Sequence, residues 1–344
     1  MPHLVNSKPP LKSTCTTCTT SKPLSKESHE KLQTKRLVLR IAFFTLFIMA
    51  PILDIFRLDL NLGQFFLFGQ ALTLDIDPAS IRSSDNISAV INLFLRVFLP
   101  FILLVVSVIY ISWRWGRLYC GWLCPHLSMV ELINGLWRRT NQKPTLWDRH
   151  PLPLEESSGR HYKTKAGNRF FLPLVILFFA ALWSISLLTY LLPPKIIYGN
   201  LIAGTLTWNQ TIFIGVSTFL FTIDFTVARH LFCRFGCAVG MAQSVAWFTN
   251  KKALVVGFER HRVAECSDCS QACDNICPMR IKPRAGKGRI VSCTQCGLCV
   301  EACAQVKADD DRGPLLYWVS GTKAQSVADP KQVSILKQQP HGDR

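Results

Sequence analysis

Four long apolar stretches dominate the hydrophobic pattern of this 344-residue chain. They cover residues 37–56, 88–113, 170–192 and 211–227. A membrane-spanning helix needs roughly 20 mostly apolar residues, and each stretch approaches or exceeds that length. A single soluble core of this size could not bury all four. The pattern therefore predicts an α-helical integral membrane protein with four transmembrane helices.

Charged residues are segregated among the segments that join these stretches. The chain has 39 Lys+Arg against 22 Asp+Glu, a net charge of +17, although 49% of its residues are hydrophobic. Basic residues predominate in 1–40, 114–169 and 229–344, whereas 54–87 is acidic and 193–210 carries only Lys195. Lys and Arg accumulate in cytoplasmic loops. We therefore predict a multi-pass protein of the bacterial inner membrane with both termini cytoplasmic.

The same pattern excludes several other classes of protein. The basic segment before the first stretch is too long for a signal peptide and no small-residue cleavage site follows, so we expect the first span to remain as an anchor. No basic patch is interleaved with aromatic residues outside the spans, so no nucleic-acid partner is expected. None of the eight histidines lies within a span, so a haem held by two histidines in the membrane is not expected.

Eight of the 14 cysteines lie close together after the last span. The second run has the C-x2-C-x2-C-x3-C spacing of a bacterial ferredoxin, and the first has one extra residue between its second and third cysteines. In two-cluster ferredoxins the fourth cysteine of each run binds the other cluster. We therefore predict two [4Fe–4S] clusters, one held by Cys266, Cys269, Cys273 and Cys303, the other by Cys293, Cys296, Cys299 and Cys277. The alternative, two four-cysteine zinc sites, fits less well because zinc ribbons separate two C-x2-C pairs by a longer loop.

Four further cysteines form two C-x3-C pairs, each just after a predicted span: Cys120 with Cys124, and Cys233 with Cys237. In a helix, residues i and i+4 share one face, so both pairs could converge at the membrane surface. Three interpretations remain open: a thiolate site for a metal or a third cluster, a pair of redox-active dithiols, or buried cysteines with a packing role. The order span, arginine, C-x3-C and amphipathic helix occurs twice, which indicates a duplicated unit.

Other polar residues give weaker signals. Asp224 lies within the fourth stretch and is either functional or interfacial. His126 and His230 adjoin the two cysteine pairs, as ligands, proton carriers or interfacial residues. Cys15 and Cys18 lie in a polar segment where a lone C-x2-C is weak evidence for metal handling.

The cysteine motifs resemble those of the membrane-bound polyferredoxins. This group includes the FixG/CcoG-type cytochrome oxidase accessory proteins and the NapH-type and NosR-type electron-transfer proteins. Residues 116–125 read GRLYCGWLCP, close to the first motif of the family, and residues 55–69 look most like the FixG/CcoG branch. The resemblance covers about residues 36–303. The chain departs from the pattern at Ala238, where the second motif has proline, and in lacking the C-terminal domain of longer FixG/CcoG proteins.

The resemblance implies a one-electron redox function in a respiratory chain. Similarity to FixG/CcoG implies reduction of a metal ion such as Cu(II) during oxidase maturation, with soft Cu(I) at the C-x3-C thiolates. Similarity to NapH implies electron transfer between quinol and a partner reductase. A third interpretation is a redox-sensing assembly scaffold without turnover. The expected partners are a respiratory membrane complex or its assembly factors, and a quinol or a cytoplasmic electron donor.

We therefore divide the chain into four parts. Residues 1–36 are expected to be a disordered cytoplasmic tail and 37–250 a four-helix membrane domain carrying both C-x3-C motifs. Residues 251–303 are expected to form a small α+β dicluster ferredoxin-like domain, followed by a polar tail over 304–344.

Overall fold

The computed structural model describes residues 26–60, 64–72, 91, 94–163, 167–266 and 269–328 of the chain. Cys15 and Cys18 lie outside the described residues. The fold is mostly helical and has two small antiparallel sheets. Helices are α1 Lys26–Met49, α4 Leu99–Trp115, α5 Leu118–Trp122, α6 Pro125–Asn141, α7 Asn168–Leu191, α8 Pro194–Ala203, α9 Trp208–Ile223, α10 Ala238–Thr249, α11 Ala272–Asn275, α12 Leu298–Val306 and α13 Thr322–Ala328. Strands are β1 Phe56–Asp59, β2 Gln64–Leu67, β3 Gln70–Leu72, β4 Val255–Phe258 and β5 Leu316–Val319.

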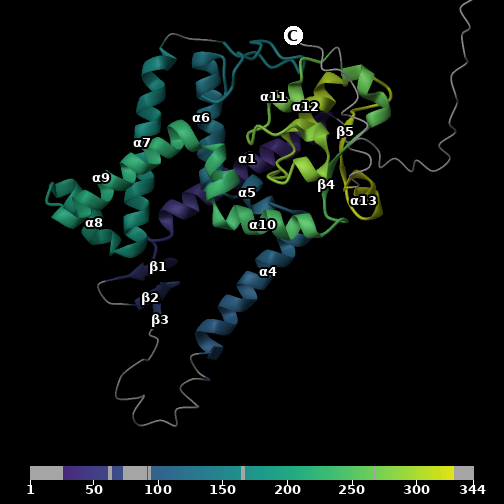
Figure 1. Ribbon diagram of the computed structural model, residues 1–344. Helices are drawn as coiled ribbons and strands as arrows, with labels where there is room; N and C mark the ends of the chain where they lie inside the picture. Colours follow the sequence, from purple (N-terminus) through teal and green to yellow (C-terminus); the bar gives the residue numbers. More distant parts are fainter. Residues whose placement is uncertain are drawn as a thin grey trace, which may run out of the picture.

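Short π-helical and 3-10 turns complete the chain. The π-helical turns are η1 Phe94–Phe98, η2 Asp224–Ala228 and η3 Phe232–Gly236, and the 3-10 turns are η4 Arg260–Cys266, η5 Pro283–Ala285 and η6 Lys287–Arg289. Figure 1 shows α7, α8 and α9 on one side, the α11, α12, β4 and β5 region on the other, and α5, α6 and α10 between them. We call the part from α1 to α10 the helical domain and residues 255–328 the ferredoxin domain.

Two helices among the described residues are long and apolar enough to span a membrane: α7 and the continuous helix Trp208–Ala228 formed by α9 and η2. They correspond to the predicted spans 170–192 and 211–227. The other two stretches are helical over α1 and α4 but are not confirmed as spans. The α1 helix carries Arg36 and Arg40, which both pair with Glu131 of α6, and the described α4 helix is only 17 residues long. The count of four spans stays a prediction.

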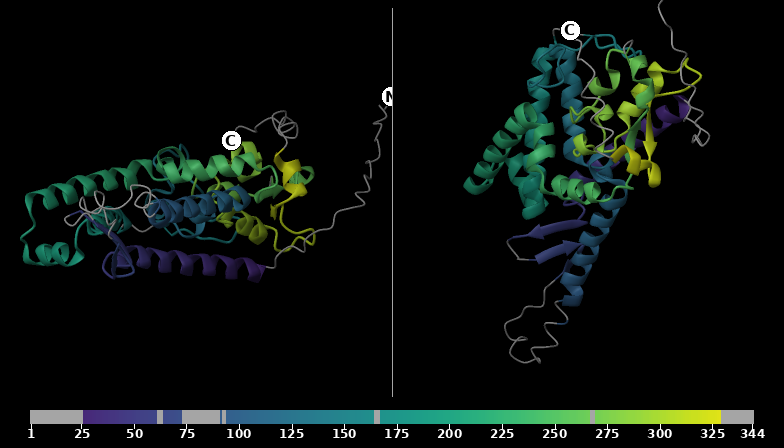
Figure 2. Two further views of the ribbon diagram at one scale, coloured as in Figure 1. Left: turned by 90° about the horizontal axis from the view of Figure 1, so that it is seen from below. Right: turned by 45° about the vertical axis from the view of Figure 1, so that its right-hand side comes forward.

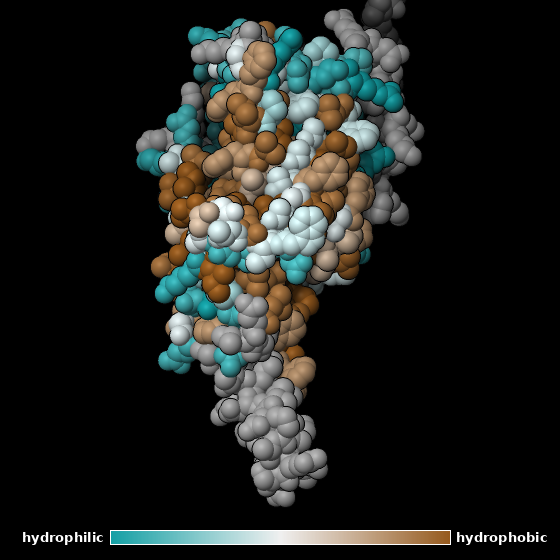
Figure 3. All heavy atoms as spheres, turned by 90° about the vertical axis from the view of Figure 1, so that its left-hand side faces the viewer, coloured by the Kyte–Doolittle hydropathy of each residue, from teal (hydrophilic) through white to brown (hydrophobic). Residues whose placement is uncertain are grey.

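The α7 and α9 helices pack together through small side chains and present large apolar ones outward. Ala180 and Ser184 are fully buried, and the Thr218 hydroxyl donates a hydrogen bond to the Ser184 hydroxyl at 3.1 Å. Lipid tails are as apolar as the helix surfaces, so the hydrophobic effect does not drive helices together within a membrane. Small residues favour their association because they permit close packing. Phe178 and Phe219 are exposed, and Figure 3 shows hydrophobic residues gathered in a broad band over this side of the molecule. This surface suits contact with lipid.

The β1–β2–β3 sheet lies at the far end of the helical domain. It is antiparallel, with Phe56 opposite Leu67 and Asp59 opposite Gln64. The backbone N–H of Leu60 donates to the carbonyl of Leu191 at 3.0 Å, which joins this region to the end of α7. Both Figure 1 and the right-hand view of Figure 2 show this sheet and α4 projecting from the same end, away from the ferredoxin domain.

The ferredoxin domain is a small α+β unit. Strands β4 and β5 pair antiparallel, with Val255 opposite Val319 and Phe258 opposite Leu316. The inward faces of β4 and β5 and helix α12 share a buried core that includes Val256, Val300 and Leu316. The fold class is therefore a mostly helical protein with a ferredoxin domain.

Both predicted tails are shorter than expected. Helix α1 begins at Lys26, so residues 26–36 are helical. Two hydrogen bonds hold this part of the helix against the rest of the fold. The Gln33 amide donates to the carbonyl of Cys296 at 3.1 Å, and Arg36 Nε donates to the carbonyl of Gly121 at 2.7 Å. At the other end, β5 and α13 belong to the ferredoxin domain, so the polar tail predicted from residue 304 is wrong up to Ala328. The β4–β5 pairing, which joins segments about 60 residues apart, holds this part of the chain in place.

Candidate functional site

The first thiol cavity, which we call the outer cavity, lies between η4, α11 and α12. Four cysteines line it together with apolar side chains of the β5 region. The cysteines are Cys266, Cys269, Cys273 and Cys303. Cys303 reaches this cavity from α12, although it belongs to the second cysteine run.

The second thiol cavity, the inner cavity, lies on the side of the ferredoxin domain that faces the helical domain. Its four cysteines are Cys277, Cys293, Cys296 and Cys299. Cys277 comes from the first run, so the fourth cysteine of each run lines the cavity of the other. The structure thus groups the eight thiols into the two sets expected from the spacing, while cluster binding by each set stays a prediction.

The extra residue in the first run is accommodated without disturbing the third cysteine. Gln271 precedes α11 with φ 56°, and Gly297 precedes α12 with φ 81°, so these two left-handed residues occupy equivalent positions. Cys273 and Cys299 are each the second residue of the helix that follows. The additional residue falls before Gln271, where the backbone N–H of Ser270 donates to the hydroxyl of Ser157 at 3.1 Å.

The donor set of each cavity fits an iron–sulfur cluster. Burial and repulsion from the neighbouring Cys296 raise the pKa of both Cys277 and Cys293 to about 12. Four thiols in such surroundings ionise together only if a positive group binds among them. Among the described residues, no three Cys, His, Asp or Glu side chains form a ready site for a single metal ion. A [4Fe–4S] cluster takes one thiolate per iron, so its ligands surround it, and when bound it would supply one-electron redox chemistry.

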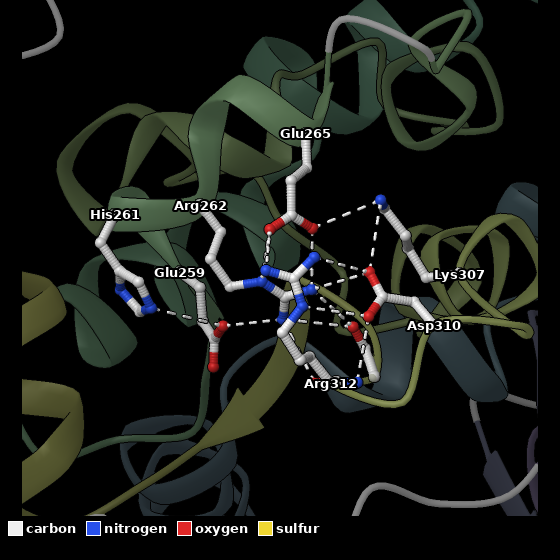
Figure 4. Close-up of polar contacts among 8 residues, drawn as sticks. Glu259, His261, Arg262, Glu265, Lys307, Asp310 and Arg312 are labelled. Atoms are coloured by element: carbon white, nitrogen blue, oxygen red, sulfur yellow. Dashed lines mark hydrogen bonds and ion pairs between the residues drawn. The ribbon is translucent and has the colours of Figure 1, made fainter.

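An ion-pair network closes the rim of the outer cavity. Glu265 and Lys307 line the cavity, and Arg262 binds Glu265 through two nitrogens at 3.0 and 2.8 Å. Figure 4 shows Arg262 at the centre of this network, between Glu265 and Asp310. Hydrogen bonds from Arg262 hold the pKa of Glu265 below its usual value. Hydrogen bonds from the backbone and side chain of Arg312 lower the pKa of Asp310 to about 2.

The two C-x3-C pairs do not lie on continuous helices, contrary to the i, i+4 expectation. Cys120 is in α5 and Cys233 in η3, but Cys124 and Cys237 are extended N-cap residues that start α6 and α10. Proline disfavours helical conformation in the preceding residue, which explains the break at Cys124, before Pro125. Ala238 does not alter this geometry, because Cys237 Sγ caps α10 by accepting a hydrogen bond from the backbone N–H of Gly240 at 3.4 Å.

The two pairs nevertheless converge, and we call Cys120, Cys124, Cys233 and Cys237 the four-thiol site. Burial, together with repulsion from Cys120 and Cys237, raises the pKa of Cys124 to about 11. Burial and the proximity of Cys124, Cys120 and Cys237 likewise raise the pKa of Cys233. The Cys120 thiol donates to Gln243 Oε1 of α10 at 3.2 Å, which links the first repeat to the second.

The structure distinguishes His126 from His230. His126 Nε2 lies 2.5 Å from Asp224 Oδ2, and its Nδ1 lies 3.3 Å from Cys233 Sγ. Asp224 therefore reaches the four-thiol site through His126, which sequence reasoning did not predict. His230 is buried with its Nδ1 lacking a hydrogen bond, and burial together with the positive charge of Arg280 lowers its pKa to about 4.

The inner cavity is held directly against the four-thiol site. Cys124 and Cys293 pack against the same apolar core, and Cys233 and Cys277 are buried within it. The loop between the inner-cavity ligands docks on α5: the carbonyl of Gln295 accepts from Trp122 Nε1 at 3.1 Å. On the other side, Cys273 and Cys299 share one core, so the two cavities are also adjacent. Three thiol sites therefore lie in series.

Comparisons with known proteins agree with this arrangement. Residues 95–144, which include Cys120 and Cys124, match a family described as a 4Fe-4S binding domain. The ferredoxin-type protein NapH of Escherichia coli is 25% identical over 313 residues, 86% of this chain and 93% of NapH. NapH of Haemophilus influenzae is 21% identical over 77% of this chain and 84% of its own length. The regulatory protein NosR of Pseudomonas aeruginosa is 26% identical over 62% of this chain but only 27% of NosR.

These similarities support a relationship to the NapH/NosR-type membrane polyferredoxins. The similarity to a NapH protein extends over nearly its full length, whereas the assignment to the FixG/CcoG branch is not shown. No solved structure matches the chain significantly. The relationship supports iron–sulfur electron transfer. The family match also falls on the first C-x3-C pair and not on the ferredoxin runs, which draws attention to the four-thiol site.

Proposed function

We propose that this chain carries single electrons between a redox partner at the four-thiol site and a second partner at the outer cavity. The observation that carries this proposal is that neighbouring thiol sites share apolar cores: Cys124 and Cys293 pack against one, and Cys273 and Cys299 are buried in another. Electron transfer needs redox centres at short separations in rigid, largely dry surroundings. The chain supplies such surroundings with buried apolar side chains.

The two ends of the series differ in their surroundings. The four-thiol site lies beside the apolar α7–α9 helices, since Asp224 at the end of α9 reaches it through His126. The outer cavity lies between η4, α11 and α12, with the charged residues Glu265 and Lys307 on its rim. We infer that a membrane-associated reactant meets the first end and a water-soluble partner meets the second.

A quinol is the reactant that we favour at the membrane end. The near full-length similarity to NapH supports it. Oxidation of one quinol to quinone releases two electrons and two protons, so each of two cluster sites would receive one electron, and the protons would pass to water. Anaerobic addition of a water-soluble quinol analogue to the oxidised protein tests this idea. We expect bleaching of the visible cluster absorbance, and absence of reduction at any accessible quinol potential would contradict it.

Reduction of Cu(II) is a second candidate, supported by the four soft thiols that converge on one place. Each Cu(II) would take up one electron to become Cu(I), which thiolate ligands favour, and a cytoplasmic electron donor would have to supply that electron. Cys120→Ser and Cys237→Ser should then abolish Cu(II) reduction while both ferredoxin clusters keep their EPR signals. Unchanged reduction rates in these variants would exclude the four-thiol site as the place of copper reduction.

A further inference from the structure

Arg117 places a positive charge at the four-thiol site, next to the loop that carries the inner-cavity cysteines. Its side chain is only 1% exposed, and Nη2 lies 3.7 Å from Cys120 Sγ and 2.9 Å from the carbonyl oxygen of Cys233. Its Nε has no hydrogen-bond partner, and no Asp or Glu among the described residues pairs with it. A buried cation requires a compensating negative charge. The guanidinium faces the Cys120 sulfur and the Cys233 carbonyl, so a negatively charged group bound at these sites would supply the compensating charge.

Arg117 is linked to both sites. Burial raises the pKa of Cys120, and Arg117 opposes that rise through its charge and its hydrogen bond. Arg117 likewise opposes the effect of burial on Cys233. Its backbone N–H also donates to Gln295 Oε1 at 2.8 Å, in the loop that carries Cys293 and Cys296 of the inner cavity. Arg117 therefore contacts the four-thiol site through its side chain and the loop of the inner-cavity cysteines through its backbone.

The fold leaves room for the guanidinium at one glycine. A Cβ on Gly240 would lie 2.2 Å from Arg117 Nη2 and 3.1 Å from Cζ. Gly240 lies in the first turn of α10, in the second repeat, and its backbone N–H donates to Cys237 Sγ. The guanidinium of the first repeat is thus enclosed by the helix start of the second, which Cys237 Sγ caps.

The arginine of the second repeat has a different environment. Arg229 is also 1% exposed, but its guanidinium donates to Asn134 Oδ1 and to the carbonyls of Pro144 and Thr226. It also lies over the ring of Trp137, 4.3 Å from the ring centroid. Arg229 has an anchoring role and contacts no thiol sulfur, so it provides a matched control for Arg117.

We propose that Arg117 is a positioning residue, a fixed positive charge that raises the reduction potential of the cluster in the inner cavity relative to that in the outer cavity. Reduction adds one negative charge to a cluster, and a nearby cation in a medium of low dielectric constant favours the reduced form. The inference rests on the proposed function, because it requires clusters in both cavities. With this charge in place, the inner cluster would be the more favourable first acceptor for electrons that arrive at the four-thiol site.

The test is an anaerobic redox titration of the full-length protein, followed by EPR, on the wild type and four variants. The Cys269→Ser variant identifies the signal of the inner cluster, because it removes an outer-cavity ligand. Arg117→Gln should lower the reduction potential of the inner cluster by at least about 59 mV, which is a tenfold change in the equilibrium constant of a one-electron couple. The outer potential should not change. Arg117→Lys should restore most of the shift, and Arg229→Gln should leave both potentials at their wild-type values.

Gly240→Ala provides a test that retains the charge and does not depend on the folding of Arg117→Gln. Alanine is favourable in a helix, and the contact at 2.2 Å should displace the guanidinium, so we expect a smaller downward shift of the inner potential. Fully loaded Arg117→Gln and Gly240→Ala proteins with unchanged potentials would overturn the inference while leaving the proposed function intact. Equal shifts of both clusters would overturn it as well. A wild type without iron–sulfur clusters would overturn both.

Discussion

Gln295 accepts a hydrogen bond from the backbone N–H of Arg117 at 2.8 Å, across 178 positions in the sequence. Gln295 lies between the inner-cavity cysteines Cys293 and Cys296, has a left-handed backbone with φ 48°, and is 1% exposed. This bond ties the ligand loop of the ferredoxin domain to the start of α5, in the helical domain. The inner cavity is consequently positioned by both domains.

The first prediction concerns the close approach of α5 to this ligand loop. A Cβ on Gly121 would lie 2.0 Å from the backbone oxygen of Thr294, which cannot move without shifting Cys293 and Cys296. We expect Gly121→Ala to destabilise the domain contact by about 1–3 kcal/mol and to increase hydrogen exchange in residues 293–296. Gly135→Ala in α6 is the control, since nothing lies within 4 Å of its Cβ position. Equal protection in both variants would contradict the prediction.

The second prediction concerns the exchange of the fourth cysteines between the two runs. Because Cys303 lines the outer cavity, Cys303→Ser should perturb the same EPR signal as Cys269→Ser. Cys277→Ser should instead reproduce the effect of Cys296→Ser, with which it shares the inner cavity. If each run served its own cluster, the two pairings would be reversed, and that result would refute the assignment.

The third prediction concerns pH. The pKa of Asp310 is about 2 and that of Glu265 is lowered, whereas the unfolded chain titrates at about 3.9 for Asp and 4.3 for Glu. Their contribution to stability is therefore complete above these ordinary values and is lost as the pH falls toward about 2. Arg262→Gln should lower the unfolding temperature of the ferredoxin domain at pH 7. The deficit should shrink below about pH 4, as the same carboxylates become protonated in the unfolded chain.

The exposed Arg289 supplies a control for this pH dependence. Arg289→Gln removes the same charge from the same domain without touching Glu265 or Asp310. We expect its unfolding temperature to follow that of the wild type at each pH. A deficit in Arg262→Gln that stays constant from pH 7 to pH 3 would show that the carboxylates do not depend on Arg262.

The spacing of the cysteines was sufficient to predict how the ferredoxin thiols are grouped. Within each run the first three cysteines are close enough in the chain to line one cavity, and the fourth, Cys277 or Cys303, lines the other. Spacing could not predict that Ser270 would absorb the extra residue, because its partner Ser157 is remote in sequence. The helices α7 and α9 followed from apolar length alone. In α1, by contrast, Arg36 and Arg40 pair with Glu131 of α6, and hydropathy does not record this tertiary contact.

The electrostatics of the four-thiol site could not be predicted from the sequence either. A repeated arginine before each cysteine pair gave a signal, but it did not distinguish Arg117, which faces thiols, from Arg229, which faces carbonyls and Trp137. Similarly, Asp224 and His126 were considered separately, and only the fold brings them within hydrogen-bond distance. The interacting side chains lie on different helices. The hydrophobic pattern of a helix predicts which of its faces is buried, but not which other helix packs against that face.

The fourth prediction concerns orientation, which stays a prediction from charge. With both termini cytoplasmic, a reporter enzyme that is active only in the oxidising periplasm should be inactive when fused after Arg344. The same reporter inserted in the segment 193–207, between α7 and α9, should be active. The reverse pair of results would invert the orientation and place the ferredoxin domain outside the cytoplasm.

Metal and sulfide quantitation on the anaerobically purified wild type, combined with EPR of the reduced protein, tests the central claim most directly. Two clusters predict about eight irons and about eight acid-labile sulfides per chain. About twelve irons would place a third cluster at the four-thiol site and extend the series with a cluster at its membrane end. About two zinc ions per chain, without iron, would contradict the account.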